Sequence, residues 1–298
     1  MAESSTDPQY VAMLREGLAA EFPFAKRAVD RLLAAMRSPH VSREAPLWAA
    51  VSAFGASWAV GASGQVFATG LRVAGLRDPA SWLAGGLAIL GYALAVAVAL
   101  RAGGRRGLAW YLAILAIRIV IQVATALPGF LTFCERSGDN CTWMQFVVPY
   151  VYLVVGFVLG AGVVMAVRSA PLGPNAFLSG AGAFSLLVTL VGLLFFFVQP
   201  QDVVAASAIT FGLNGGAAFA AGIVLRIRSA RFAPAAFVTA LLLLTWLAAA
   251  GPFVLLVPQG GASQPAALYL SGLTNTLALG VGWFATDRRQ RARTTAAA

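Results

Sequence analysis

Long apolar stretches separated by short polar segments fill most of this chain after residue 45. A helix needs about 20 consecutive apolar residues to cross the hydrocarbon core of a bilayer. Eight stretches reach that length, approximately at residues 46–69, 80–100, 107–131, 143–167, 175–198, 203–226, 232–257 and 264–286. The pattern predicts an all-α fold, a polytopic transmembrane helical bundle of about eight spans.

The same pattern divides the chain into three regions. We expect residues 1–45 to form a cytoplasmic amphipathic segment, residues 46–286 an eight-helix transmembrane domain, and residues 287–298 a basic cytoplasmic tail. The first region lacks the basic, short-apolar, small-residue order of a cleavable signal peptide. Its second predicted helix, from Pro23 to about Met36, has an apolar and a basic face. Such a helix is expected to lie on an anionic leaflet, with a partner-docking arm as the alternative.

Basic residues are distributed unequally between the two ends of the predicted helices. The chain has 21 Lys and Arg residues against 11 Asp and Glu residues, a net charge of +10. In an eight-span arrangement 17 of the basic residues lie on one side, and only Arg72, Arg77 and Arg136 lie on the other. This positive-inside pattern predicts a multi-pass protein of the cell membrane with both termini in the cytoplasm. Because the pattern accounts for the net charge, no nucleic-acid partner is expected.

Both cysteines, Cys134 and Cys141, fall in the short segment between the third and fourth stretches. The charge pattern places this segment outside the cytoplasm, where disulfides persist. We therefore predict a disulfide between them. No histidine accompanies them, so a metal site is not expected here.

Parts of the chain repeat. Residues 161–177 and 221–237 match at an offset of 60, and an offset of 67 aligns Arg101 with Arg168. Each period holds two stretches, so the pattern predicts four similar hairpins in the same orientation, as parallel repeats around a central axis. Glycines four residues apart also predict close helix packing in two stretches: Gly156 and Gly160 in one, Gly212 and Gly216 in the other.

Side chains that usually carry intramembrane chemistry are missing from the eight stretches. They contain no Asp, Glu or His, since Asp202 lies at a boundary and His40 lies before the first stretch. Proton relays, imidazole-bound haem and zinc sites need such residues. We therefore expect no metal, no cofactor and no enzymatic activity, and an intramembrane enzyme acting on lipid is disfavoured.

Arg118 stands out because it lies near the middle of the third stretch. A permanent charge at that depth costs roughly 3 kcal/mol on insertion scales. Gln122 lies one turn away on the same helix face, and the repeat offsets align Arg118 with Ser185 and Thr245. We predict a ligand-binding polar chamber at the midplane, formed by Arg118, Gln122, Ser185, Asn214, Thr245 and Asn275. In the alternative, Arg118 bonds backbone carbonyls and the two asparagines hold helices together.

Two functions remain open at this point. The first is a binder or facilitative transporter of a small anionic or amphiphilic solute, because an arginine with no acidic partner favours such a ligand. The alternative is a non-catalytic scaffold or accessory subunit of a membrane protein complex. Membrane lipids are expected partners in both cases, together with a small anionic ligand in the first and a membrane protein in the second.

Overall fold

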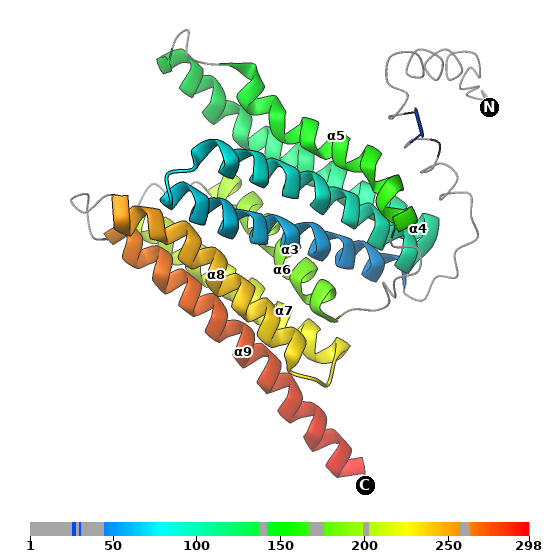
Figure 1. Cartoon of the computed structure of the whole chain (residues 1–298). Helices are drawn as coiled ribbons and strands as arrows, with labels where there is room; N and C mark the ends of the chain where they lie inside the picture. Colours follow the sequence, from blue (N-terminus) through cyan, green and yellow to red (C-terminus); the bar gives the residue numbers. More distant parts are fainter. Residues whose placement is uncertain are drawn as a thin grey trace.

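The computed structural model of this chain describes residues 26, 27, 30, 45–137, 142–166, 176–198, 203–256 and 263–297. All regular secondary structure in this part is α-helical, so the all-α prediction is confirmed. Figure 1 shows the helices packed side by side, with α3 between α4 and α5 on one side and α7 to α9 on the other. Their bounds are α3 Pro46–Val73, α4 Arg77–Ser137, α5 Trp143–Ala166, α6 Ala176–Val198, α7 Val203–Arg228, α8 Ala233–Leu256 and α9 Ser263–Ala297.

The long element α4 is two helices joined at Gly104. This glycine has φ 60° and ψ −153°, a backbone conformation that side chains with a Cβ atom rarely adopt. The chain folds back there. A Cβ atom at Gly107 would lie 2.7 Å from the carbonyl oxygen of Ala99, which shows that the two halves meet just beyond the turn. The two halves of α4 therefore coincide with the predicted stretches 80–100 and 107–131.

Helices occupy all eight predicted apolar stretches. Helix formation by itself does not show that these segments cross a membrane. Within the described residues, Arg77–Arg136 is long and apolar enough for a membrane span by length and composition. Phe146–Gly160, Ala176–Leu190 and Ala233–Thr245 are shorter apolar helical stretches. The eight-span topology and the repeat architecture stay predictions.

Helices α3 and α6 make the closest contact at the centre of the bundle. A Cβ atom at Gly55 would lie 2.9 Å from the backbone nitrogen of Gly182 and would also meet the carbonyl oxygen of Leu178. The hydroxyls of Ser52 and Ser179 are buried in the same contact, with their oxygens 3.1 Å apart. The rings of Trp58 and Phe184 follow one to two turns later on both helices, so α3 and α6 run parallel.

Two further parallel contacts depend on glycine. The first half of α4 packs on α5, where a Cβ atom at Gly160 would lie 2.9 Å from the Cβ atom of Val96 and Gly156 faces Tyr92. The close packing predicted for Gly156 and Gly160 is thus confirmed. Helix α7 packs on α9, with Gly222 against the Leu279 carbonyl and Gly282 against the Phe219 carbonyl.

The same prediction is wrong for Gly212 and Gly216 on α7. Both are exposed, and no described atom lies within 4 Å of where their Cβ atoms would be. The close contact of α7 with α9 is made by Gly222 instead, because this residue lies on the face that meets Leu279. Spacing alone identifies a glycine pair but not the neighbour that it faces.

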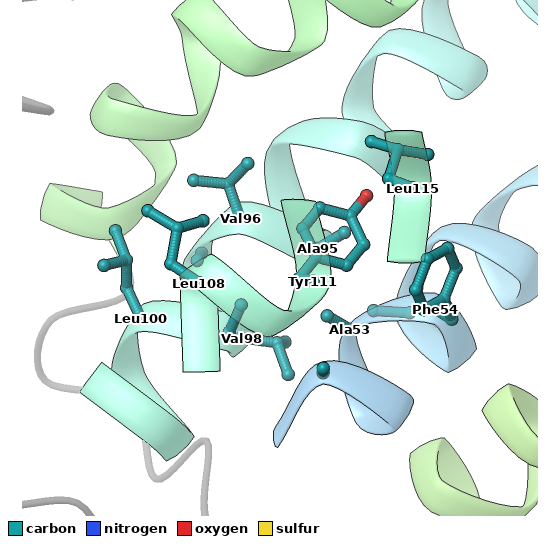
Figure 2. Close-up of a cluster of buried hydrophobic side chains, with 13 residues drawn as sticks. Ala53, Phe54, Ala95, Val96, Val98, Leu100, Leu108, Tyr111 and Leu115 are labelled. Carbon is teal, nitrogen blue, oxygen red and sulfur yellow. The ribbon is translucent and has the colours of Figure 1, made fainter. Parts of the chain in front are cut away.

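Small side chains fill much of the interior of the bundle. Six of the 13 buried residues in the cluster formed by α3 and α4 are alanines (Figure 2). Five of the 11 in the cluster formed by α6 to α9 are also alanines. Many large apolar side chains point outward instead, among them Trp82, Phe237 and Val120, which are 82%, 69% and 68% exposed. Water-soluble proteins favour the opposite distribution, with large apolar side chains inside and few of them exposed.

Several predictions fall largely on residues outside the described part. The N-terminal segment is described only at residues 26, 27, 30 and 45. Cys134 lies near the end of α4 and is not a free cysteine, whereas Cys141 is outside the described residues. The Cys134–Cys141 disulfide therefore stays a prediction. Most of the repeat segment 161–177 also lies outside the described part.

Candidate functional site

A cavity of about 340 Å³ opens between α3, both halves of α4, and α5. One face of the second half of α4 supplies much of its wall, because Tyr111, Leu115, Arg118 and Gln122 follow one another at intervals of three or four residues. The opposite face of this helix carries Ile117 and Val120, which are exposed. Helical periodicity thus turns the polar residues of an otherwise apolar helix toward the cavity.

Arg118 also lines a second cavity, of about 400 Å³, between α3, α4 and α6. Its Nη1 donates a hydrogen bond to the Ser185 hydroxyl oxygen at 3.5 Å, which is near the upper limit for such a bond. Gln122 borders both cavities as well. The Arg118 side chain therefore stands in the wall that the two cavities share.

Hydrogen-bond donors dominate the polar lining of the first cavity. Arg118 carries five N–H donors, and Tyr92, Tyr111 and Tyr150, whose hydroxyls can donate as well, are residues of the same lining. Among the described residues, no Asp or Glu lines either cavity. The arrangement therefore presents one permanent positive charge and several donors, and its lining provides no anion to balance them.

The Tyr111 hydroxyl is the most deeply buried of these groups. Tyr111 is 0% exposed, and its hydroxyl has no hydrogen-bond partner among the described residues. In Figure 2 the hydroxyl oxygen points toward Leu115, which lines the cavity, and away from Leu108. The ring packs against Phe54 at a centroid distance of 4.9 Å. Its neighbours thus enclose both the ring and the hydroxyl, which has less than 1 Å² of accessible surface.

Aromatic rings form much of the rest of the wall, together with aliphatic side chains. Phe54 and Tyr111 come from α3 and α4, while Phe146 and Tyr150 come from α5, with their ring centroids 5.7 Å apart. Such rings give an apolar surface that suits the body of an amphiphilic molecule. The cavity combines this apolar wall with the donors around Arg118.

Three of the six predicted site residues come together, namely Arg118, Gln122 and Ser185. Asn214 and Asn275 are 8% and 0% exposed on α7 and α9, and neither lines either cavity. Thr245 on α8 donates a hydrogen bond to the carbonyl oxygen of Leu241, one turn back in its own helix, at 2.7 Å. The six residues thus do not surround one of these two cavities.

The alternative interpretation can be compared with the same contacts. Within the described part of the chain, the hydrogen bond of Arg118 goes to a hydroxyl and not to a backbone carbonyl. The side-chain oxygens of Asn214 and Asn275 have no hydrogen-bond partner among the described residues. The alternative requires a bond from Arg118 to a backbone carbonyl and bonds to the two asparagine oxygens from other helices. Neither is present among the described residues.

The tyrosines are the site residues that the sequence reasoning missed. Tyr111 could have been found, because it lies seven residues before Arg118 and so shares its helix face. Tyr92 and Tyr150 come from other helices, and nothing in their spacing connects them with Arg118. Only the packing of α4 on α5 brings them to the same cavity.

A charged cluster, also missed, joins the end of α7 to the last third of α9. Asp287 accepts a hydrogen bond from Arg226 Nε at 2.8 Å and forms an ion pair with Arg291, whose Nε lies 2.9 Å from the other carboxylate oxygen. The guanidinium of Arg226 also lies 5.7 Å from the ring centre of Trp283. Asp287 and Arg226 are both largely buried, whereas Arg291 is exposed. We interpret this cluster as a structural clamp between the two helices.

Comparisons of this chain with protein-family models, with curated proteins and with solved structures found no match.

Proposed function

We propose that this chain is a multi-pass protein of the cell membrane, with about eight spans and both termini in the cytoplasm. The outward-facing Trp82, Val120 and Phe237 support this, because lipid tails accept large apolar side chains that water does not. The alanine- and glycine-rich contacts support it too, since membrane helices associate through small residues.

The parallel helix contacts support the repeat prediction. In a chain that crosses a membrane repeatedly, every second helix runs in the same direction, as α3 and α6 do, and as α7 and α9 do. Ser52 and Ser179 meet across α3 and α6 and are 127 residues apart. Arg118 and Ser185 are 67 residues apart, which equals one predicted repeat offset. Two of the predicted hairpins would then contribute equivalent positions to the contact at Arg118.

Membrane topology can be tested with single cysteines in a background that lacks Cys134 and Cys141. Ala74 lies between α3 and α4, and Ala230 lies between α7 and α8. In intact cells, a membrane-impermeant maleimide should label Ala74→Cys directly and should label Ala230→Cys only after permeabilisation. Labelling of both positions in intact cells, or the reverse order, would contradict the proposed orientation.

Within this domain, the Arg118 cavity binds a small anionic or amphiphilic solute, and the protein acts as a non-catalytic binder or facilitative transporter. The observation that carries this proposal is the position of Arg118 between two cavities, where its hydrogen-bond partner among the described residues is a hydroxyl and not a carboxylate. A guanidinium in the bilayer core is costly, by about 3 kcal/mol or more. A solute that supplies the missing anion offsets that cost, which gives the charge a reason to be there.

Replacement of Arg118 with leucine tests the proposal. Mass spectrometry of molecules that co-purify with the protein in lipid nanodiscs should find a small anionic or amphiphilic compound with the wild type. The Arg118→Leu variant should retain at least tenfold less of it and should unfold at an equal or higher temperature, because a poorly paired charge has been removed.

Arg72→Leu is the matched control, because Arg72 is exposed near the end of α3. This substitution removes the same charge outside the cavities. It should retain the compound as the wild type does. Equal retention by the Arg118→Leu variant would refute the role of this residue. A stoichiometric protein partner with no retained compound would instead favour the accessory-subunit alternative.

A further inference from the structure

We infer that the Arg118 cavity selects a monocarboxylate whose apolar body carries a ring; this inference rests on the ligand-binding function proposed above. It names the chemical class of the ligand. The charge of the cavity, the planar fork of Arg118 and the aromatic part of the wall lead to it.

The charge of the cavity favours a ligand with a single negative charge. Of the residues that the structure describes, Arg118 is the one charged residue in the lining of either cavity, so this lining holds one positive charge. A carboxylate neutralises this charge and leaves no excess. A phosphate monoester carries a charge of about −1.5 to −2 at neutral pH and would leave a negative charge in a low-dielectric site. A neutral carbonyl compound would leave the arginine unbalanced.

The guanidinium of Arg118 matches the geometry of a carboxylate. The two carboxylate oxygens accept about four hydrogen bonds, and an arginine can supply two of them from its planar fork. Tyr111 belongs to the lining of the same cavity, but its hydroxyl has less than 1 Å² of accessible surface. A ligand therefore does not reach this hydroxyl, and Arg118 is the group that holds the carboxylate.

The remaining wall suits an apolar body with a ring. Phe54, Tyr92, Phe146 and Tyr150 line the cavity together with Tyr111 and belong to three different helical elements. Aromatic side chains favour tilted or edge-to-face contacts with another ring, beyond the gain from burying apolar surface. The cavity volume of about 340 Å³ falls in the range of sites for small organic ligands.

Three probes of similar size separate the head-group classes. Phenylacetate carries one negative charge, phenylacetamide carries none, and phenyl phosphate carries up to two. Each is titrated against the purified full-length protein in nanodiscs of zwitterionic lipid, and the unfolding temperature is followed. Phenylacetate should reach its half-maximal shift at a concentration at least tenfold lower than either of the other two.

Two tyrosine variants serve as controls. Tyr111→Phe removes only a hydroxyl with less than 1 Å² of accessible surface, so it should bind phenylacetate as the wild type does. Its unfolding temperature without ligand should stay equal or rise, since the lost hydroxyl had no partner in the described structure. Tyr152 lies on α5 near Gly85 and does not line the cavity, so Tyr152→Phe should also bind phenylacetate as the wild type does.

Arg118→Lys keeps the positive charge but loses the planar fork, and it should weaken phenylacetate binding at least threefold. If phenylacetamide or phenyl phosphate binds as well as phenylacetate, or if none of the three binds, the monocarboxylate inference is overturned. The proposed function still stands in that case, provided that the Arg118→Leu variant loses the compound that co-purifies with the wild type. If that variant retains the compound as well, the proposed function fails with it.

Discussion

Replacement of Gly55 with leucine should prevent α3 and α6 from packing and should leave little correctly folded protein. The Cβ atom alone would meet the carbonyl oxygen of Leu178 and the backbone nitrogen of Gly182, and backbone atoms cannot rotate away as a flexible side chain can. Overpacking a well-packed contact costs about 1–3 kcal/mol, and a backbone clash lies at or above the upper end of this range. Gly182→Leu should have a similar effect, because its Cβ atom would meet the Val51 carbonyl.

The control for this prediction lies on the same helix. A Cβ atom at Gly61 would have no described atom within 4 Å, so Gly61→Leu makes the same change in side-chain volume on α3 without a clash. Detergent-solubilised Gly61→Leu should elute from size-exclusion chromatography as one sharp peak at the wild-type position. Gly55→Leu should aggregate or unfold at a temperature at least 10 °C lower than the wild type, by an order-of-magnitude estimate. Wild-type elution and stability of Gly55→Leu would refute the contact between α3 and α6.

Replacement of Asp287 with alanine should destabilise the protein by about 3 kcal/mol, the range expected when one partner of a buried ion pair is removed. The loss leaves the largely buried guanidinium of Arg226 without its carboxylate, at the contact between α7 and α9. Its interaction with the Trp283 ring persists but replaces only part of the lost energy. Thermal unfolding in nanodiscs, monitored by tryptophan fluorescence, measures the effect.

The other arginine of the cluster provides a control for Asp287→Ala. Arg291 pairs with the same carboxylate from the next turn of α9, but its side chain is 78% exposed. Exposed ion pairs contribute only about 0–1 kcal/mol, so Arg291→Ala should change stability little. If Arg291→Ala and Asp287→Ala lower the unfolding temperature equally, the stabilising partner of Asp287 is not Arg226.

The positions of the helices follow directly from the sequence. Each predicted stretch coincides with a helical segment to within a few residues at most boundaries, and α9 alone continues well past its predicted end. The reversal at Gly104 lies between the predicted stretches 80–100 and 107–131, where Arg101 and Arg105 interrupt the apolar pattern. Apolar length is a property of each segment by itself, so it can be assessed without knowing what the segment packs against.

The candidate site was only partly predictable. Arg118 could be identified because a charge inside an apolar stretch is costly wherever the helix lies. Ser185 followed from the repeat offset, and the structure places its hydroxyl beside that guanidinium. The offset also indicated Thr245, whose hydroxyl bonds within its own helix. A shared depth does not determine which way a side chain faces, and this is why Asn214 and Asn275 do not line the two cavities.

The sequence by itself determined where the helices lie, where the chain reverses and which residue carries an unbalanced charge. These features depend on the transfer energies and backbone preferences of consecutive residues. The tertiary structure decided which glycines meet a neighbour, which tyrosines join Arg118 and that Asp287 pairs with Arg226. Those outcomes depend on the rotation of each helix about its axis, and that rotation is set by the steric fit of several helices at once.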